Sequence, residues 1–193
     1  MKRSLGAKTL VYPTPVFIIG TYDREGKANV MTVAWGGICC SQPPCVAIAV
    51  RKANYTYGNL MEKGAFTVNI PSQDQVEEAD YFGIVSGRNE DKIARVGMTA
   101  VRSELVDAPY LKECPMVLEC QMLHAYEIGL HTQFIGEIKD VKMEESLLDA
   151  SGASSIENVR PFLYAPDDRS YYSIGAKLAK GFEVGYRVRG NQK

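Results

Sequence analysis

The chain has 193 residues, of which 46% are hydrophobic and 23% charged, a composition typical of one soluble globular domain with an ample core. Its formal net charge of -1 and its lack of a basic run argue against electrostatic attraction to nucleic acid. No apolar run approaches the roughly 18 residues of a membrane span, and no apolar segment of a signal peptide follows the N-terminus. We therefore expect a single cytoplasmic domain over residues 1–193, without nucleic-acid or membrane partners.

The first elements form a predicted β-hairpin. Residues 16–21 and 28–35 have the apolar and alternating patterns of strands, and the DREGK turn between them carries Gly26. Proline at positions 13 and 15 keeps the preceding segment extended. After residue 35, two glycines and the Cys39-Cys40 pair interrupt the strand pattern, so we expect an irregular segment up to Pro43-Pro44.

The next segment alternates strands and helices. Residues 45–50 (CVAIAV) are apolar throughout and predict a buried central strand. A short helix is expected over residues 56–63, with Asn54 as its N-cap and Gly64 at its end, followed by a strand over 65–70. Ser72 is expected to cap a second helix over 73–83. Residues 84–96 turn polar and predict a loop that leads into a short helix.

Two long strands follow, over residues 116–128 and 132–143, joined by a turn at Gly129. The remaining tail is mixed, with a Ser/Gly-rich loop and two aromatic segments. About six strands and two or three short helices, without an internal repeat, predict a mainly β fold in which an antiparallel barrel carries helices on its outside.

The stretch ANVMTVAWGG, residues 28–37, combines side chains suited to a ligand surface. Alternation places Asn29, Met31, Val33 and Trp35 on one strand face, and Trp35 is the only tryptophan. The two following glycines would let backbone N–H groups approach a flat ligand closely. The alternative is a core strand with a tryptophan at its edge.

The five cysteines, at positions 39, 40, 45, 114 and 120, predict reduced thiols. Their odd number without a secretory signal argues against a disulfide framework. The chain has no CxxC pair, and its two histidines are not spaced with cysteines as zinc ligands are. We therefore predict no metal site.

Several motifs, taken in order, resemble the flavin reductase-like family of FMN-binding split barrels. They are NVMTVAW, the segment 51–59, SGRNEDK and GLHTQFIGEI. Within that family, the opening KRSLGAKTLVYPTPVFIIGTYD and the segment AWGGICCSQPPC are most similar to flavoredoxins. The resemblance runs from near the N-terminus to about Gly175. It implies a split β-barrel of Greek-key-like topology, FMN as cofactor, and a homodimer with the flavin at the subunit interface.

An FMN site needs donors for a phosphate dianion. Arg51 and Lys52 directly follow a buried strand, while Tyr55 and Thr56 begin the next helix, where free N–H groups favour an anion. The resemblance points to the same stretch. The predicted phosphate site consists of Arg51, Lys52, Thr56 and Lys92, and Tyr55 is predicted to contact the cofactor beside it. The alternative is a solvated charged turn.

The resemblance also implies contacts to the rest of the cofactor. It places Ser86, Gly87 and Lys92 of SGRNEDK against FMN, where a lysine near the ring would stabilise negative charge on it. The alternative is a surface helix in which Asp91 forms an ion pair with Arg88 or Arg95. Around the ring and ribityl chain the resemblance places residues of the opening stretch, namely Asn29, Met31, Thr32, Val33, Ala34 and Trp35. Cys40 could reach the ring or be a small buried hydrophobe.

His131 is the candidate catalytic residue. The resemblance places it near the open flavin face where nicotinamide docks, although Leu130 replaces the aspartate that usually precedes this histidine. The missing aspartate leaves the orientation and charge of His131 open.

The predicted function is an FMN-binding redox protein of flavoredoxin type that exchanges electrons with protein partners. The match to AWGGICCSQPPC favours this carrier. The alternative within the class is an NAD(P)H-dependent oxidoreductase that reduces free flavin or a small acceptor, which the retained His131 keeps open. A third hypothesis, from another class, is a split-barrel binding protein without flavin.

Overall fold

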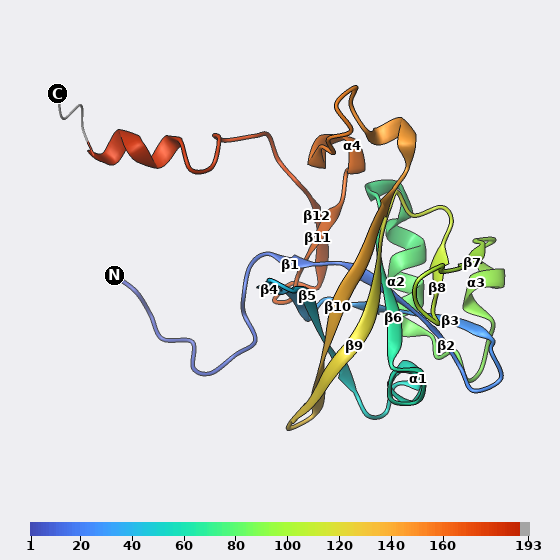
Figure 1. Cartoon of the computed structure of the whole chain (residues 1–193). Helices are drawn as coiled ribbons and strands as arrows, with labels where there is room; N and C mark the ends of the chain where they lie inside the picture. The colour runs from blue at the N-terminus through green and yellow to red at the C-terminus, as the bar shows by residue number, and fades with distance from the viewer. Residues whose placement is uncertain (190–193) are drawn as a thin grey trace.

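The computed structural model describes residues 1–189 and is built around a seven-stranded antiparallel sheet (Figure 1). The order across the sheet is β3-β2-β6-β9-β10-β5-β4. Its strands are β2 (Phe17–Tyr22), β3 (Ala28–Val33), β4 (Gly36–Ser41), β5 (Pro44–Arg51), β6 (Ala65–Ile70), β9 (Met116–Ile128) and β10 (His131–Met143). All six neighbouring pairs are antiparallel, as the sequence predicts.

The sheet curls because its two edge strands are consecutive in the chain. β3 and β4 lie at opposite ends of the strand order, yet only Ala34 and Trp35 separate them. At this junction the backbone N–H of Ala49, in β5, donates to the carbonyl of Trp35 at 2.8 Å. The predicted mainly β split barrel with flanking helices is confirmed.

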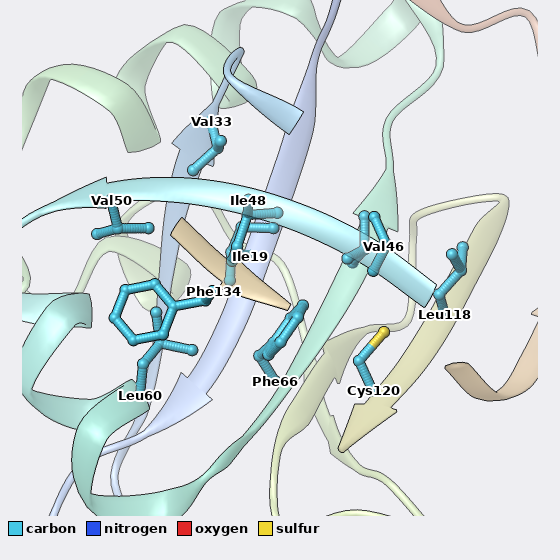
Figure 2. Close-up of a cluster of buried hydrophobic side chains, with 11 residues drawn as sticks. Ile19, Val33, Val46, Ile48, Val50, Leu60, Phe66, Leu118, Cys120 and Phe134 are labelled. Atoms are coloured by element: carbon cyan, nitrogen blue, oxygen red, sulfur yellow. The ribbon is translucent and has the colours of Figure 1, made fainter. Parts of the chain in front are cut away.

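The barrel interior is filled by apolar side chains from six strands and from α1 (Tyr55–Lys63). Figure 2 shows Ile19, Ile48, Phe66 and Phe134 directed toward one another at its centre. Gly136 of β10 is required there, because a Cβ at this position would lie 2.5 Å from the Phe66 ring. Close packing of this kind makes every added methyl group costly.

Short helices cover the outer face of β2 and β3. They are α2 (Val76–Ile84), preceded by the 3-10 turn η1 (Gln73–Gln75), and α3 (Lys92–Arg95). Ala79, Phe82 and Ile93 of these helices pack against Ile18 and Val30 of the strands. This second core fixes the C-terminal end of α2 and the start of α3 beside β3.

The remaining elements lie around this framework. A small sheet joins β1 (Thr14–Pro15), β11 (Phe162–Ala165) and β12 (Ser170–Ser173), and another pairs β7 (Ala100–Arg102) with β8 (Pro109–Leu111). The others are η2 (Glu145–Leu147), α4 (Ile156–Val159) and η3 (Val184–Arg189). Among residues 1–189, no helix combines the length and apolar character needed to cross a bilayer.

Two local predictions are wrong. Residues 36–41, expected to be irregular, form β4, because pairing with β5 over five registered residue pairs overrides the glycines. Asn54 does occupy the N-cap position of α1, but its side chain does not cap the helix. Its Oδ1 accepts from the backbone N–H of Arg51 at 3.1 Å instead.

The other predicted elements are found close to their expected bounds. The hairpin of β2 and β3 forms, and α1 ends at Gly64, which adopts the left-handed conformation with φ of 61°. The helix expected over residues 73–83 divides into η1 and α2. The single domain expected over residues 1–193 remains a prediction, and its last four residues lie outside those described.

Candidate functional site

A groove of about 390 Å³ lies where α1, β3 and the segment between α2 and α3 meet, which is the size of a small-molecule site. Three separate parts of the sequence contribute to it. Its walls are formed by residues 53–56, by residues 82–89 together with Lys92, and by Asn29 and Met31.

Lys92 forms the buried wall of the groove. Its side chain donates from Nζ to the carbonyls of Phe82 and Val85, both at 2.9 Å, at the C-terminal end of α2. A cation at this end of a helix satisfies free carbonyls and complements the helix dipole. Only 5% of the residue is exposed, and burial lowers the pKa of Lys92 to about 8. The ammonium group is therefore largely protonated at neutral pH.

Asn29, Thr56 and Gly87 form a tightly fitted polar corner. The Asn29 amide donates from Nδ2 to Oγ1 of Thr56 at 3.0 Å, and both residues are buried. A Cβ on Gly87 would clash with Asn29 Oδ1 and lie 3.1 Å from Cδ1 of Tyr55. The loop backbone can approach β3 and α1 this closely only because residue 87 is glycine.

Tyr55 and Arg88 form the outer rim. The Arg88 guanidinium lies over the Tyr55 ring, 5.6 Å from its centroid, and donates to the Ala53 carbonyl at 2.9 Å. The Tyr55 hydroxyl in turn donates to Asp23 at 2.9 Å. Because the Asn54 side chain turns back to Arg51, the N-terminus of α1 faces the groove without a side-chain cap. Two cationic side chains and a helix N-terminus thus favour an anionic ligand here.

The groove brings together half of the fourteen residues that the sequence nominated for cofactor binding. These seven come from all three predicted motifs, and they are Asn29, Met31, Tyr55, Thr56, Ser86, Gly87 and Lys92. Residues of different motifs, 24 to 63 positions apart in the sequence, therefore meet in one site. Their role in binding a cofactor remains a prediction.

The other nominated residues of the opening stretch lie elsewhere. The Thr32 hydroxyl donates to the Ala79 carbonyl, and Val33 is part of the barrel core. Ala34 and Trp35 lie half-buried at the junction that closes the barrel. Thr32 and Val33 belong to β3, as Asn29 and Met31 do, and Ala34 and Trp35 follow it directly. None of these four residues lines the groove.

Arg51 and His131 lie opposite each other at the ends of β5 and β10. Arg51 is exposed and His131 is half-buried, two residues beyond the hairpin turn at Gly129. Lys52 forms an exposed ion pair with Glu127 at 2.7 Å. None of the three lines the groove, so a phosphate role for Arg51 and Lys52 and a catalytic role for His131 remain predictions.

Cys40 is exposed on β4, so the alternative of a buried hydrophobe is wrong for this residue. Its cross-strand partner is Cys45, and its thiol donates to the Gln42 carbonyl at 3.4 Å. All five cysteines are free thiols. Within the described chain, no group of three or more His, Cys, Asp or Glu side chains is arranged to hold a metal ion.

Sequence reasoning did not nominate eight of the residues that line the groove, and Arg88 and Asn89 are among them. Both belong to SGRNEDK, where Arg88 was considered only as an ion-pair partner of Asp91. The signal that could have found Arg88 is its position directly after Ser-Gly, because a turn that brings residues 86 and 87 to a ligand also brings the next side chain.

Comparison with known proteins identifies the family. A model of the flavin reductase like domain matches residues 9–175, which include the whole groove. The chain belongs to the flavin reductase-like family. The resemblance on which the sequence predictions rest is therefore confirmed.

Solved members of this family share the fold over nearly the whole flavin reductase-like chain. Flavoredoxin of Desulfovibrio vulgaris (Miyazaki F) is 55% identical, with a TM-score of 0.92 over 96% of this chain and 100% of that one. Flavoredoxin from Methanosarcina acetivorans is 32% identical, with a TM-score of 0.91 over 97% and 99% of the two chains. A protein of Aeropyrum pernix is 31% identical over 166 residues, which are 84% of this chain and 62% of that protein.

Proposed function

We propose that this protein is an FMN-binding redox protein of flavoredoxin type, which holds its flavin tightly and passes electrons to protein partners. The observation that carries the proposal is the groove, where seven nominated residues from three sequence motifs converge. Membership of the flavin reductase-like family and 55% identity to a flavoredoxin support the same function.

The chemistry of the groove fits an FMN phosphate and polyol chain. Lys92 and Arg88 supply cationic donors, Thr56 a hydroxyl, and the N-terminus of α1 backbone N–H groups. The close approach at Gly87 leaves backbone where a side chain would otherwise fill the corner. Bound FMN would supply the electron-transfer chemistry. The protein's residues bind and orient it, and the Lys92 cation favours negative charge on the ligand.

The test is the cofactor content of purified protein. We expect flavin absorption bands, and FMN as the compound that mass spectrometry finds after heat release. Lys92→Met should weaken FMN binding roughly tenfold to a hundredfold, because it removes charge-assisted hydrogen bonds. Lys112→Met, at an exposed lysine outside the groove, is the matched control. Colourless protein that does not take up added FMN would contradict the proposal and favour a flavin-free binding protein.

An NAD(P)H-dependent flavin reductase is the second candidate. The observation that favours it is that His131 of β10 and Arg51 of β5 lie opposite each other in the strand register. The Arg51 cation beside the histidine suits a nucleotide phosphate. Anaerobic titration with NADH and NADPH distinguishes the two functions. Bleaching of the flavin spectrum at stoichiometric nicotinamide, lost in His131→Ala, supports the reductase; an unchanged spectrum supports the carrier.

We further propose that the protein acts in the cytoplasm as a homodimer. Family membership supports the dimer, and the reduced cysteines support a reducing compartment. Light scattering of the purified protein tests the dimer, and fractionation of the source cells tests the compartment.

A further inference from the structure

The C-terminal arm, residues 174–189, leaves the barrel after β12 and runs away from it (Figure 1). It ends in the 3-10 turn η3. Its large apolar side chains lie in solvent: Leu178 is 99% exposed, Phe182 100% and Val188 91%. Solvated linkers carry few such residues, since exposed apolar groups gain nothing from water. The arm therefore has the composition of a segment that packs against another surface.

The charge of the arm opposes that of the rest of the chain. Residues 174–189 contain four basic residues and one acidic residue. The first 175 residues contain 17 basic and 22 acidic residues. An arm of this composition is attracted to the body of this same protein.

The arm is long enough to cross to a second copy. The ten residues before η3 span up to about 33 Å when extended, and the six residues of η3 add about 12 Å, whereas a domain of 175 residues is roughly 40 Å across. In Figure 1 the arm points away from its own barrel, so contact with a neighbouring body requires no reversal of its path.

The body offers an apolar pocket of about 300 Å³ close to where the arm begins. Tyr12, Leu163 and Tyr172 contribute to its wall, and Asp168 supplies a carboxylate. The pocket combines apolar surface with negative charge. That is the complement of an arm that carries Leu178 and Phe182 together with basic residues.

We propose that the C-terminal arm of each copy packs across a second copy of this chain, with Leu178 and Phe182 on the partner's apolar surface. The apolar pocket with Asp168 is part of the receiving surface. In a twofold dimer each copy gives and receives one arm, so the contact is made twice. This inference uses only the homodimer of the proposed function and is independent of flavin binding.

Charge substitutions in the full chain test the proposal. Leu178→Asp combined with Phe182→Asp places two carboxylates on the proposed contact. Ala176→Asp combined with Ala179→Asp adds the same charge at small, exposed positions of the same arm and is the matched control. By light scattering over a dilution series, we expect the first variant to raise the dimer dissociation constant at least a hundredfold, and the control to change it less than threefold.

A photo-crosslinking residue at position 182 tests the contact directly, with a covalent dimer as the expected product. The proposal is overturned if the native protein is monomeric, if both double variants dimerise as it does, or if crosslinking stays within one chain. Monomeric protein that binds anionic lipid vesicles through the arm would assign the arm to a membrane surface instead. Flavin content is measured in the same samples, so a colourless dimer with the expected arm contacts would refute the flavin function alone.

Discussion

The buried ammonium of Lys92 should make the stability of the flavin-free protein depend on pH. Burial lowers the pKa of Lys92 from 10.5 to about 8 in the folded chain, whereas in the unfolded chain it keeps its ordinary value. Between these two pH values the unfolded state binds more protons, so the free energy of unfolding rises with pH. Below pH 8 both states are protonated and Lys92 contributes no slope.

The size of the effect follows from the same two values. Between pH 8 and pH 10.5, each pH unit adds about 1.4 kcal/mol to the free energy of unfolding. From pH 7 to pH 10 the free energy of unfolding therefore increases by about 2 to 3 kcal/mol. Other groups titrate in this range as well. The quantity to measure is therefore the difference between the native protein and Lys92→Met, a variant of similar shape that cannot titrate.

Urea unfolding of the stripped protein at pH 7, 8, 9 and 10 provides the measurement. We expect the native protein to gain about 2 to 3 kcal/mol over Lys92→Met from the lowest to the highest pH. Lys112→Met, at an exposed lysine, should show no such divergence. If the curves for native protein and Lys92→Met stay parallel, Lys92 is solvated and does not form the buried wall of the groove.

Three further substitutions test other parts of the structure. Gly87→Ala should weaken FMN binding at least tenfold, because the added Cβ would displace the Asn29 side chain. Gly58→Ala, whose Cβ meets open space, is the control and should leave binding unchanged. Equal effects of the two variants in an FMN titration would contradict this role of Gly87. Thr56→Val removes the hydroxyl that accepts from Asn29 and should cost about 1 to 3 kcal/mol of stability in urea; an unaltered midpoint would show the bond to be dispensable. Gly136→Ala should cost about 1 to 3 kcal/mol by overpacking the barrel, and a crystal structure without displacement of neighbouring side chains would contradict this reason.

The sequence by itself determined the framework of the protein and seven of the residues that converge in the groove. Apolar alternation predicted the strands, because a barrel strand with one buried face repeats every two residues. Glycines at positions 26 and 64 marked turns that need a positive φ, and both adopt one. The four motifs were sufficient for the family, which the match over residues 9–175 confirmed.

Only the tertiary structure decided which nominated residues share one site. Arg51 and Thr56 are five positions apart, yet one lies at the end of β5 and the other in the groove. A turn lies between them, closed by the Asn54 N–H donating to the Arg51 carbonyl at 2.9 Å, and the groove forms only on the side where β3 and the segment after α2 pack against α1. β4 also depended on a partner: residues 36–41 have no strand pattern of their own, and pairing with β5 supplies the backbone hydrogen bonds that make them one.

Lys92 shows most clearly the difference between what the sequence determines and what only the tertiary structure decides. Its sequence neighbours Asp91 and Arg95 indicate an exposed helical turn, and its charge favours solvent. The contacts that bury it come from Phe82 and Val85, ten and seven positions away, at the free end of α2. A residue's charge is written in the sequence, but its burial, and with it its pKa and its place in the groove, is set by the elements that pack around it.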